Sequence, residues 1–260
     1  MIFDILLGLL LYATQRRTIW IPIISMALVT VFIEFGKRLI FPALLVNSNL
    51  SLQDKAFLEP LFPLIRKLNF PTHKIFVVPG MANAGVAGIG RYALMLVGTG
   101  LVTTFGFLES DLIAVIGHEL GHWVLKHSLY HSIQDSILNT CVILLAIYFM
   151  RNKAFYKAFD IETNPQLPIG IGLILTTGFI QISTFFSQPL SNYLSQMYEY
   201  QADAFSIGLG YGKEMIAMIP KLHVRGTSLA EPLYGLFTST HPVYSSRVRA
   251  IVEKVLTSQR

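Results

Sequence analysis

The chain has 260 residues, of which 53% are hydrophobic and only 13% are charged, and its formal net charge is +5. Because soluble domains carry about 25% charged residues, this composition favours a membrane protein. The basic residues cluster beside apolar segments and form no patch interleaved with aromatic residues, so a membrane surface explains them better than nucleic acid does. The single cysteine, Cys141, excludes an intrachain disulfide.

The N-terminal region predicts at least one membrane helix. Residues 5–15 are apolar but too short to span a bilayer comfortably. Residues 18–35 are a better candidate, because basic residues flank both ends and Trp20 suits the membrane interface. We therefore expect residues 1–40 to form a membrane anchor and residues 41–260 to form the functional domain.

The next part of the chain predicts small extramembrane elements. Residues 51–69 have the pattern of an amphipathic helix interrupted by two prolines. Residues 74–78 and 92–97 predict short strands around a loop rich in glycine and alanine at 80–90. This is not a phosphate-binding loop, because no helix beginning with Lys-Ser or Lys-Thr follows it.

The most informative feature is His-Glu-Leu-Gly-His at residues 118–122, inside a predicted helix over residues 110–127 with Ser110 as its N-cap. Residues four apart lie on one face of a helix. His118 and His122 can therefore present two ring nitrogens to one Zn²⁺ at about 2.0–2.1 Å.

Glu119 follows the first of these histidines, where it can take a proton from a water molecule. This is the HExxH arrangement of metallopeptidases. Gly121 costs about 1 kcal/mol of helix stability relative to alanine, but its small size lets a substrate or another backbone come close. The alternative is two unrelated histidines on a buried helix, and the apolar residues around the motif make the metal site the better interpretation.

A catalytic zinc site needs a third protein ligand and keeps a fourth position open. Glu199 can supply that ligand, and Asp203, four residues later on the same helix face, can hydrogen-bond the free ring nitrogen of a zinc-binding histidine. Two carboxylates on a solvated helix face are the alternative. That alternative is weakened because no other acidic residue occurs between Glu162 and Glu214.

Two further apolar segments, residues 136–150 and 168–189, predict membrane crossings between the two halves of this site. Because both halves must reach one metal ion, the chain between them must cross an even number of times. The loop between the crossings is basic, which favours a cytosolic position for it under the positive-inside rule. Residues 211–224 and 243–257 predict amphipathic helices.

Three motifs together resemble a known family. They are Ile-Gly-His-Glu-Leu-Gly-His-Trp at 116–123, Glu-Tyr-Gln-Ala-Asp-Ala-Phe at 199–205 and Ser-Thr-His-Pro at 239–242. In order and spacing they are similar to the motifs of the type I CAAX prenyl endopeptidases, from about Pro42 to the C-terminus. The resemblance implies a mostly α, multi-pass membrane protein with a gluzincin-like zinc protease core and a short β element at the active site.

The resemblance also implies a set of residue roles. One Zn²⁺ per chain would be bound by His118, His122 and Glu199, with Glu119 as general base. Asp203 would hold a zinc-binding histidine in place.

Three other residues receive roles at the substrate. By the resemblance, His241 would stabilise the oxyanion and Asn83 would hold the substrate backbone. Arg247 can pair with a substrate carboxylate or with Asp203, or it can be a solvated helix residue. The remaining histidines are expected at polar or interfacial positions, with no ligand role: His73, His127, His131 and His223.

The sequence therefore predicts an integral-membrane zinc endopeptidase, acting on peptides or proteins with prenylated CAAX-type C-termini. Its expected partners are that substrate and the lipid bilayer, with no nucleic acid and with a homo-oligomer left open. Its membrane would be the endoplasmic reticulum in a eukaryote or the inner membrane in a bacterium. The family places the zinc toward the cytosol, with the basic loop on the opposite side.

Two alternatives stay open at this point. One is a heat-shock type of membrane quality-control zinc protease, and the other is an inactive scaffold derived from a protease. The chain also departs from the family pattern, which usually has a basic residue where Gln196-Met197-Tyr198 stands and often reads Ser-Asn-Ala-Tyr where residues 82–85 read Ala-Asn-Ala-Gly. Family members carry additional N-terminal membrane helices that enclose a chamber.

Overall fold

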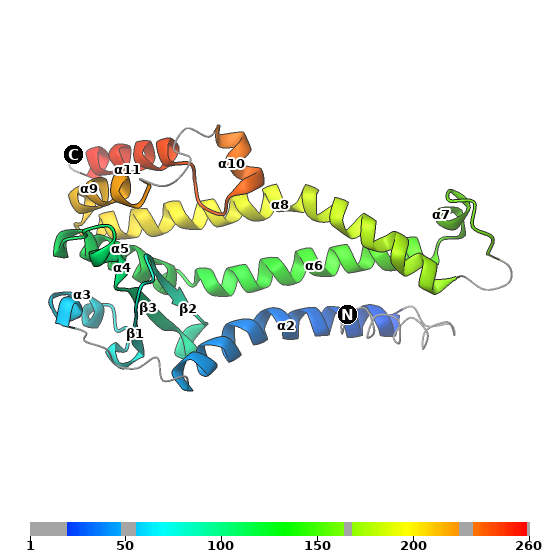
Figure 1. The fold of residues 1–260 in the computed structure, drawn as a ribbon, viewed down its shortest axis with the longest axis horizontal. Helices are drawn as coiled ribbons and strands as arrows, with labels where there is room; N and C mark the ends of the chain where they lie inside the picture. The colour runs from blue at the N-terminus through cyan, green and yellow to red at the C-terminus, as the bar shows by residue number, and fades with distance from the viewer. Residues whose placement is uncertain (1–19, 48–55, 164–167, 224–230, 259–260) are drawn as a thin grey trace. The chain divides into compact units, whose positions relative to one another are not determined.

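The computed structural model describes residues 20–47, 56–163, 168–223 and 231–258 (Figure 1). The chain forms two compact units that alternate along the sequence. The first unit comprises Met1–Phe35 and Ser132–Leu190, and the second comprises Gly36–His131 and Ser191–Arg260.

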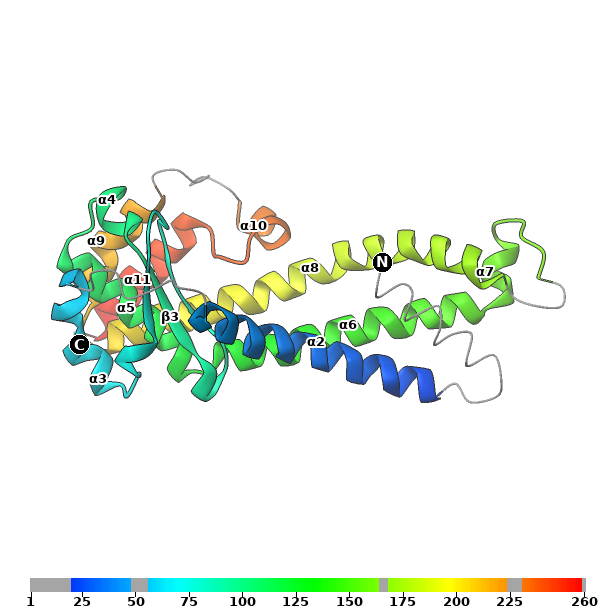
Figure 2. The same cartoon turned by 60° about the horizontal axis from the view of Figure 1, so that its bottom comes forward.

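The first unit is built from long helices. It contains the beginning of α2 (Trp20–Asn47), most of α6 (His127–Arg151), the short α7 (Lys153–Lys157) and the first half of α8 (Ile169–Gly208). Within this unit α6 and the first half of α8 lie side by side (Figure 2). Aromatic side chains pack between them, with the ring centroids of Phe149 and Phe179 4.6 Å apart.

Two helices in the described part of the chain are long and apolar enough to cross a membrane, over residues 127–151 and 170–208. The first contains the crossing segment expected at 136–150, and the second contains all but the first two residues of the one expected at 168–189. The predicted N-terminal span at 18–35 lies partly outside the described residues, and residues 5–15 lie wholly outside them. From Trp20 onward this segment is helical and continues as α2 to Asn47.

The second unit contains a three-stranded sheet of β1 (Ile75–Val78), β2 (Ala84–Ala87) and β3 (Leu94–Gly98). The strand order is β1-β3-β2, with β1 parallel and β2 antiparallel to the central β3. The sequence predicted β1 and β3 but not β2, which lies in the expected loop. Three of its four residues are alanine or glycine, which are depleted in strands, so the strand leaves a weak signal in the sequence.

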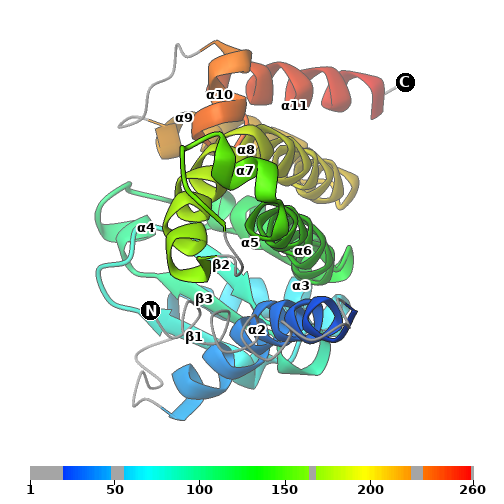
Figure 3. The same cartoon turned by 90° about the vertical axis from the view of Figure 1, so that its right-hand side faces the viewer.

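The motif helix, α5 (Glu109–Val124), packs against β2 (Figure 3). The prediction of Ser110 as its N-cap is wrong, because the cap position is Leu108 and the Asp111 carboxylate accepts from the Leu108 backbone N–H at 2.8 Å. The predicted end at 127 is also wrong. The backbone at Lys126 takes a left-handed conformation, with φ of 58°, and a new helix begins at the next residue.

Several of the remaining elements contribute buried side chains to one hydrophobic core around α5. Residues 51–55 of the helix expected at 51–69 lie outside the described residues, and from Ala56 onward this segment is a 3₁₀ turn, η1 (Ala56–Leu61), followed by α3 (Phe62–Lys67). The short elements are η2 (Thr72–Lys74), η3 (Gly90–Tyr92), α4 (Gly100–Thr103) and α10 (Pro232–Thr238). The two expected amphipathic helices are present as α9 (Gly212–His223) and α11 (Tyr244–Ser258), and α9 packs against both α5 and α11.

Two glycines let α5 and the second half of α8 approach closely. A Cβ at Gly121 would lie 3.1 Å from the Cα of Ala202, and a Cβ at Gly117 would lie 2.7 Å from the Ser206 hydroxyl oxygen. That hydroxyl donates to the Ala114 carbonyl at 3.2 Å, which ties the two helices together. Another backbone is therefore what approaches Gly121.

The end of β3 has a similar constraint. The Gly98 N–H donates to the Asn83 carbonyl at 2.9 Å, and a Cβ at Gly98 would lie only 1.8 Å from the Met81 carbonyl oxygen. We expect Gly98→Ala to destabilise the protein by about 3 kcal/mol or more, because backbone must move to relieve the overlap. Gly85→Ala is the matched control in the same sheet, since nothing lies within 4 Å of a Cβ there. Thermal unfolding in detergent should separate the two variants, and equal melting temperatures would contradict the packing described.

Candidate active site

Three side chains from two helices form a compact cluster in the second unit. One ligand atom from each of His118, His122 and Glu199 lies within 4.8 Å of the other two. The two histidines come from adjacent turns of α5, and Glu199 comes from α8. The spacing of four residues thus places both imidazoles on one helix face, as the sequence predicted.

The distances within this cluster match those of a zinc site. The Nε2 atoms of His118 and His122 are 3.1 Å apart, and they lie 3.5 Å and 3.3 Å from the carboxylate oxygens of Glu199. Ligand atoms bound tetrahedrally to zinc at about 2.0–2.1 Å lie roughly 3.3 Å from one another. Two imidazole nitrogens and one carboxylate are also a donor set that zinc accepts, so the residues fit this ion.

Asp203 holds the other ring nitrogen of His118. Nδ1 of His118 lies 2.8 Å from a carboxylate oxygen of Asp203, and both residues are buried. Burial opposes the charged imidazolium, but the hydrogen bonds to Asp203 and Glu199 outweigh it and raise the pKa of His118 to about 10. A proton on this ring therefore competes with a metal ion.

Arg247, on α11, completes the support of Asp203. Its Nε and Nη2 donate to the two carboxylate oxygens at 2.8 Å and 2.7 Å, a bidentate pair. The residue is 5% exposed, and its Nη1 lies 3.5 Å from Glu199. Of the roles expected for Arg247, the structure shows the pair with Asp203. Its burial leaves little surface for a substrate carboxylate.

Glu119 lies between the cluster and the sheet edge. Its carboxylate accepts a hydrogen bond from the backbone N–H of Val86 in β2. Burial raises the pKa of Glu119 above its usual value, and the nearby His118 and His122 only partly offset this. A carboxylate with a raised pKa holds a proton more readily, as a general base requires.

His241 also reaches the cluster. Its Nδ1 lies 3.0 Å from a carboxylate oxygen of Glu199, while its side chain is 61% exposed, so the ring faces solvent on its other side. The Ser239 hydroxyl bonds both the N–H and the carbonyl of His241, at 3.0 Å and 2.9 Å, which fixes the turn that carries it.

Asn83 does not contribute to the cluster. It is exposed, and its side-chain oxygen accepts from the backbone N–H of Ala84 at 2.9 Å, at the start of β2. It thus lies at the beginning of the edge strand that carries Val86.

Sequence reasoning missed one residue of the site, His127. It is buried, and its Nδ1 lies 2.9 Å from Nδ1 of His122 while its Nε2 lies 3.0 Å from the Gln201 side-chain oxygen. Residues five apart on one continuous helix point in different directions, so the break at Lys126 is what brings the two rings together. The only feature of the sequence that could have indicated this contact is a sign that the helix ends near Lys126.

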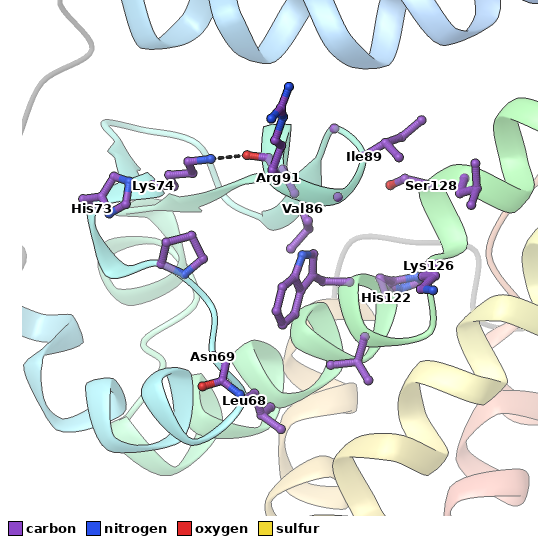
Figure 4. A pocket seen from close by; sticks show the side chains of 17 residues that line it. Leu68, Asn69, His73, Lys74, Val86, Ile89, Arg91, His122, Lys126 and Ser128 are labelled. Atoms are coloured by element: carbon purple, nitrogen blue, oxygen red, sulfur yellow. Dashed lines mark hydrogen bonds between the residues drawn. The ribbon is translucent and has the colours of Figure 1, made fainter.

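A cavity of about 860 Å³ adjoins the cluster and is lined by both Val86 and His122 (Figure 4). Much of its wall is apolar, including Ile89, Trp123 and Leu129. Three lysine or arginine side chains also line it, Lys74, Arg91 and Lys126, together with His73. The close-up shows Lys74 donating to the backbone carbonyl of Arg91 on one wall, with Lys126 near His122 on the other.

Comparisons with known proteins agree with this geometry. The chain is 32% identical over 193 residues to the probable CAAX prenyl protease 1 of Schizosaccharomyces pombe, covering 72% of this chain and 40% of that protein. It is 33% identical over 225 residues to a CAAX prenyl protease 1 homolog of Arabidopsis thaliana, covering 82% and 51%. The chain spans about half the length of these curated relatives.

A solved structure shares the fold of this chain. The crystal structure of S. mikatae Ste24p matches with a TM-score of 0.71 at 24% identity, over 94% of this chain and 62% of that one. The model of Peptidase family M48 matches residues 53–255, which include every residue of the cluster. The chain therefore belongs to Peptidase family M48, whose members are zinc metallopeptidases.

Proposed function

We propose that this protein is an integral-membrane, multi-pass zinc endopeptidase that binds one Zn²⁺ through His118, His122 and Glu199. The observation that carries the proposal is the cluster of these three ligands at zinc spacing with Glu119 beside it. The two membrane-length helices support the location in a membrane.

The chain supplies the groups that peptide hydrolysis needs. Zinc, when bound, provides a Lewis acid that polarises the scissile carbonyl and makes water more acidic. Glu119 takes the proton from the attacking water and returns it to the leaving amine. His241 donates to the oxyanion through its solvent-facing side.

The substrate backbone would lie along β2. Because β2 is an edge strand, a peptide can add to it through main-chain hydrogen bonds. Asn83, at the beginning of that strand, would contact the same peptide. A peptide bound in this way would have its scissile bond beside Glu119, whose carboxylate interacts with the strand at Val86.

We expect metal binding and turnover to separate in variants of α5 and α8. His118→Ala and Glu199→Ala should lose most of the zinc, because each removes one ligand. Glu119→Gln should keep zinc and lower kcat by on the order of 10²–10⁴, because the amide cannot accept a proton. Metal analysis and peptide turnover measure both effects.

Glu109→Gln, at the exposed start of the same helix, is the control and should keep both zinc and activity. Full zinc occupancy in either alanine variant would reject the ligand assignment. Turnover of Glu119→Gln within a few-fold of the wild type would show that another residue is the base.

A second pair of variants distinguishes support of the oxyanion from support of the metal. His241→Ala should lower kcat by on the order of 10²–10³ with little change in zinc content. Asp203→Asn should instead weaken zinc affinity by on the order of 10–100-fold, because it weakens the hold on His118. The reverse result would indicate that His241 is a zinc ligand and that Glu199 is a structural carboxylate.

For the substrate, we propose a prenylated CAAX-type C-terminus. The names of the curated relatives support this class, and so does the cavity beside His122. Its basic residues would attract the free carboxylate of a peptide that ends shortly after the scissile bond. A quality-control protease cleaving internal sites would have no use for that attraction.

The test compares a farnesylated peptide that has a free C-terminal carboxylate with its C-terminal amide and with the unprenylated peptide. We expect the farnesylated carboxylate peptide to be cleaved fastest by the detergent-purified protein. Lys126→Gln should raise the KM of the farnesylated carboxylate peptide by about two- to fivefold, because that is the effect of losing one exposed ion pair. The KM of the C-terminal amide should not change. Lys67→Gln, exposed on α3 outside the cavity, is the control.

Equal cleavage of all three peptides would favour the quality-control protease. Zinc binding without turnover of any peptide would favour the inactive scaffold.

A further inference from the structure

We propose that His127 and Gln201 are positioning residues, which hold His122 in the tautomer and orientation that metal binding requires. The proposal rests on the zinc site proposed above. Its basis is a chain of two hydrogen bonds that leads away from the cluster, from His122 to His127 at 2.9 Å and from His127 to Gln201 at 3.0 Å.

The chemistry of each ring fixes the direction of this chain. His122 faces the cluster with Nε2, so the proton of its neutral ring must be on Nδ1, and this Nδ1–H can only donate. The contacting Nδ1 of His127 must then be the acceptor. The proton of His127 is therefore on Nε2, from which it donates to the Gln201 side-chain oxygen.

Every donor in this chain of hydrogen bonds therefore meets an acceptor. With the opposite tautomer of His127, two N–H groups would face each other at the His122 contact. The arrangement thus suits His122 only when its Nε2 is free to bind a cation.

The surroundings of His127 keep its ring in place. The residue is 1% exposed, and its ring stacks on Tyr198 of α8 with centroids 4.8 Å apart and planes 20° apart. Tyr198 and Gln201 are three residues apart and so lie on one face of α8. A buried ring held between two contacts from one helix is well suited to orient a neighbour.

The two histidine ligands would then be supported by different chemistry. His118 bonds a carboxylate, Asp203, whereas His122 bonds a neutral imidazole. An anionic partner makes a ligand more basic, while a neutral partner mainly fixes its orientation. We therefore expect loss of His127 to reduce zinc affinity without removing the site.

The experiment measures the zinc affinity of the detergent-purified 260-residue chain by competition with a chelator. His127→Phe keeps a ring to stack on Tyr198 but offers no acceptor, so zinc affinity should fall by about 10–100-fold. His127→Asn places an oxygen near the former Nδ1 and should stay within about fivefold of the wild type. Gln201→Leu should cost less than His127→Phe, because Gln201 is exposed and water can replace it.

His131→Phe is the matched control. His131 lies four residues further along α6 and packs edge-on against the same Tyr198 ring, at 4.8 Å between centroids. It takes no part in the hydrogen-bond chain to His122, so zinc affinity should not change. Thermal unfolding of the metal-free variants should show similar stabilities, which separates an effect on the metal from an effect on folding.

The outcomes also separate this proposal from the proposed function. If His118→Ala abolishes zinc binding but His127→Phe and Gln201→Leu leave the affinity unchanged, His127 has no positioning role while the zinc site stands. If His127→Asn is as weak as His127→Phe, the acceptor is not what matters and the proposal is also wrong. A wild-type protein that binds no zinc would overturn both.

Discussion

The close approach of α5 and α8 is the constraint on which the site depends. Gly117 and Gly121 remove the side chains that would separate the helices, so that Ala202 comes against the α5 backbone. Only at this separation can Glu199 reach both imidazoles across the helix pair. The carboxylates brought inside in this way are costly to bury, and they are tolerated because the histidines and Arg247 pair with them.

All the proposed catalytic and supporting groups belong to the second unit. The ligands, the base, Asp203, Arg247 and His127 lie within Gly36–His131 and Ser191–Arg260. The site brings together residues that are far apart in the sequence. Arg247 on α11, for example, donates to Asp203 on α8. Membership of Peptidase family M48 over residues 53–255 is consistent with this, since the matched region includes the whole cluster.

What could be predicted from the sequence depended on local periodicity. The spacing of four placed His118 with His122 and Glu199 with Asp203, because a helix fixes such pairs whatever surrounds it. The contact of His127 with His122 could not be predicted, because it follows from one left-handed residue, Lys126, that turns the chain between two helices. The partner of Arg247 could not be predicted for another reason. Asp203 lies on a different helix, so only the folded structure decides whether Arg247 pairs with Asp203 or with a substrate carboxylate.

The edge strand β2 has a consequence beyond the site. An open sheet edge that can accept a peptide can also accept the same edge of another copy, which is a route to aggregation. This strand has only four residues, and one of them is Gly85. Short strands of small residues pair weakly without further contacts. The composition that makes β2 hard to predict would therefore also limit self-association through this edge. A peptide that pairs there would depend on further contacts outside the strand.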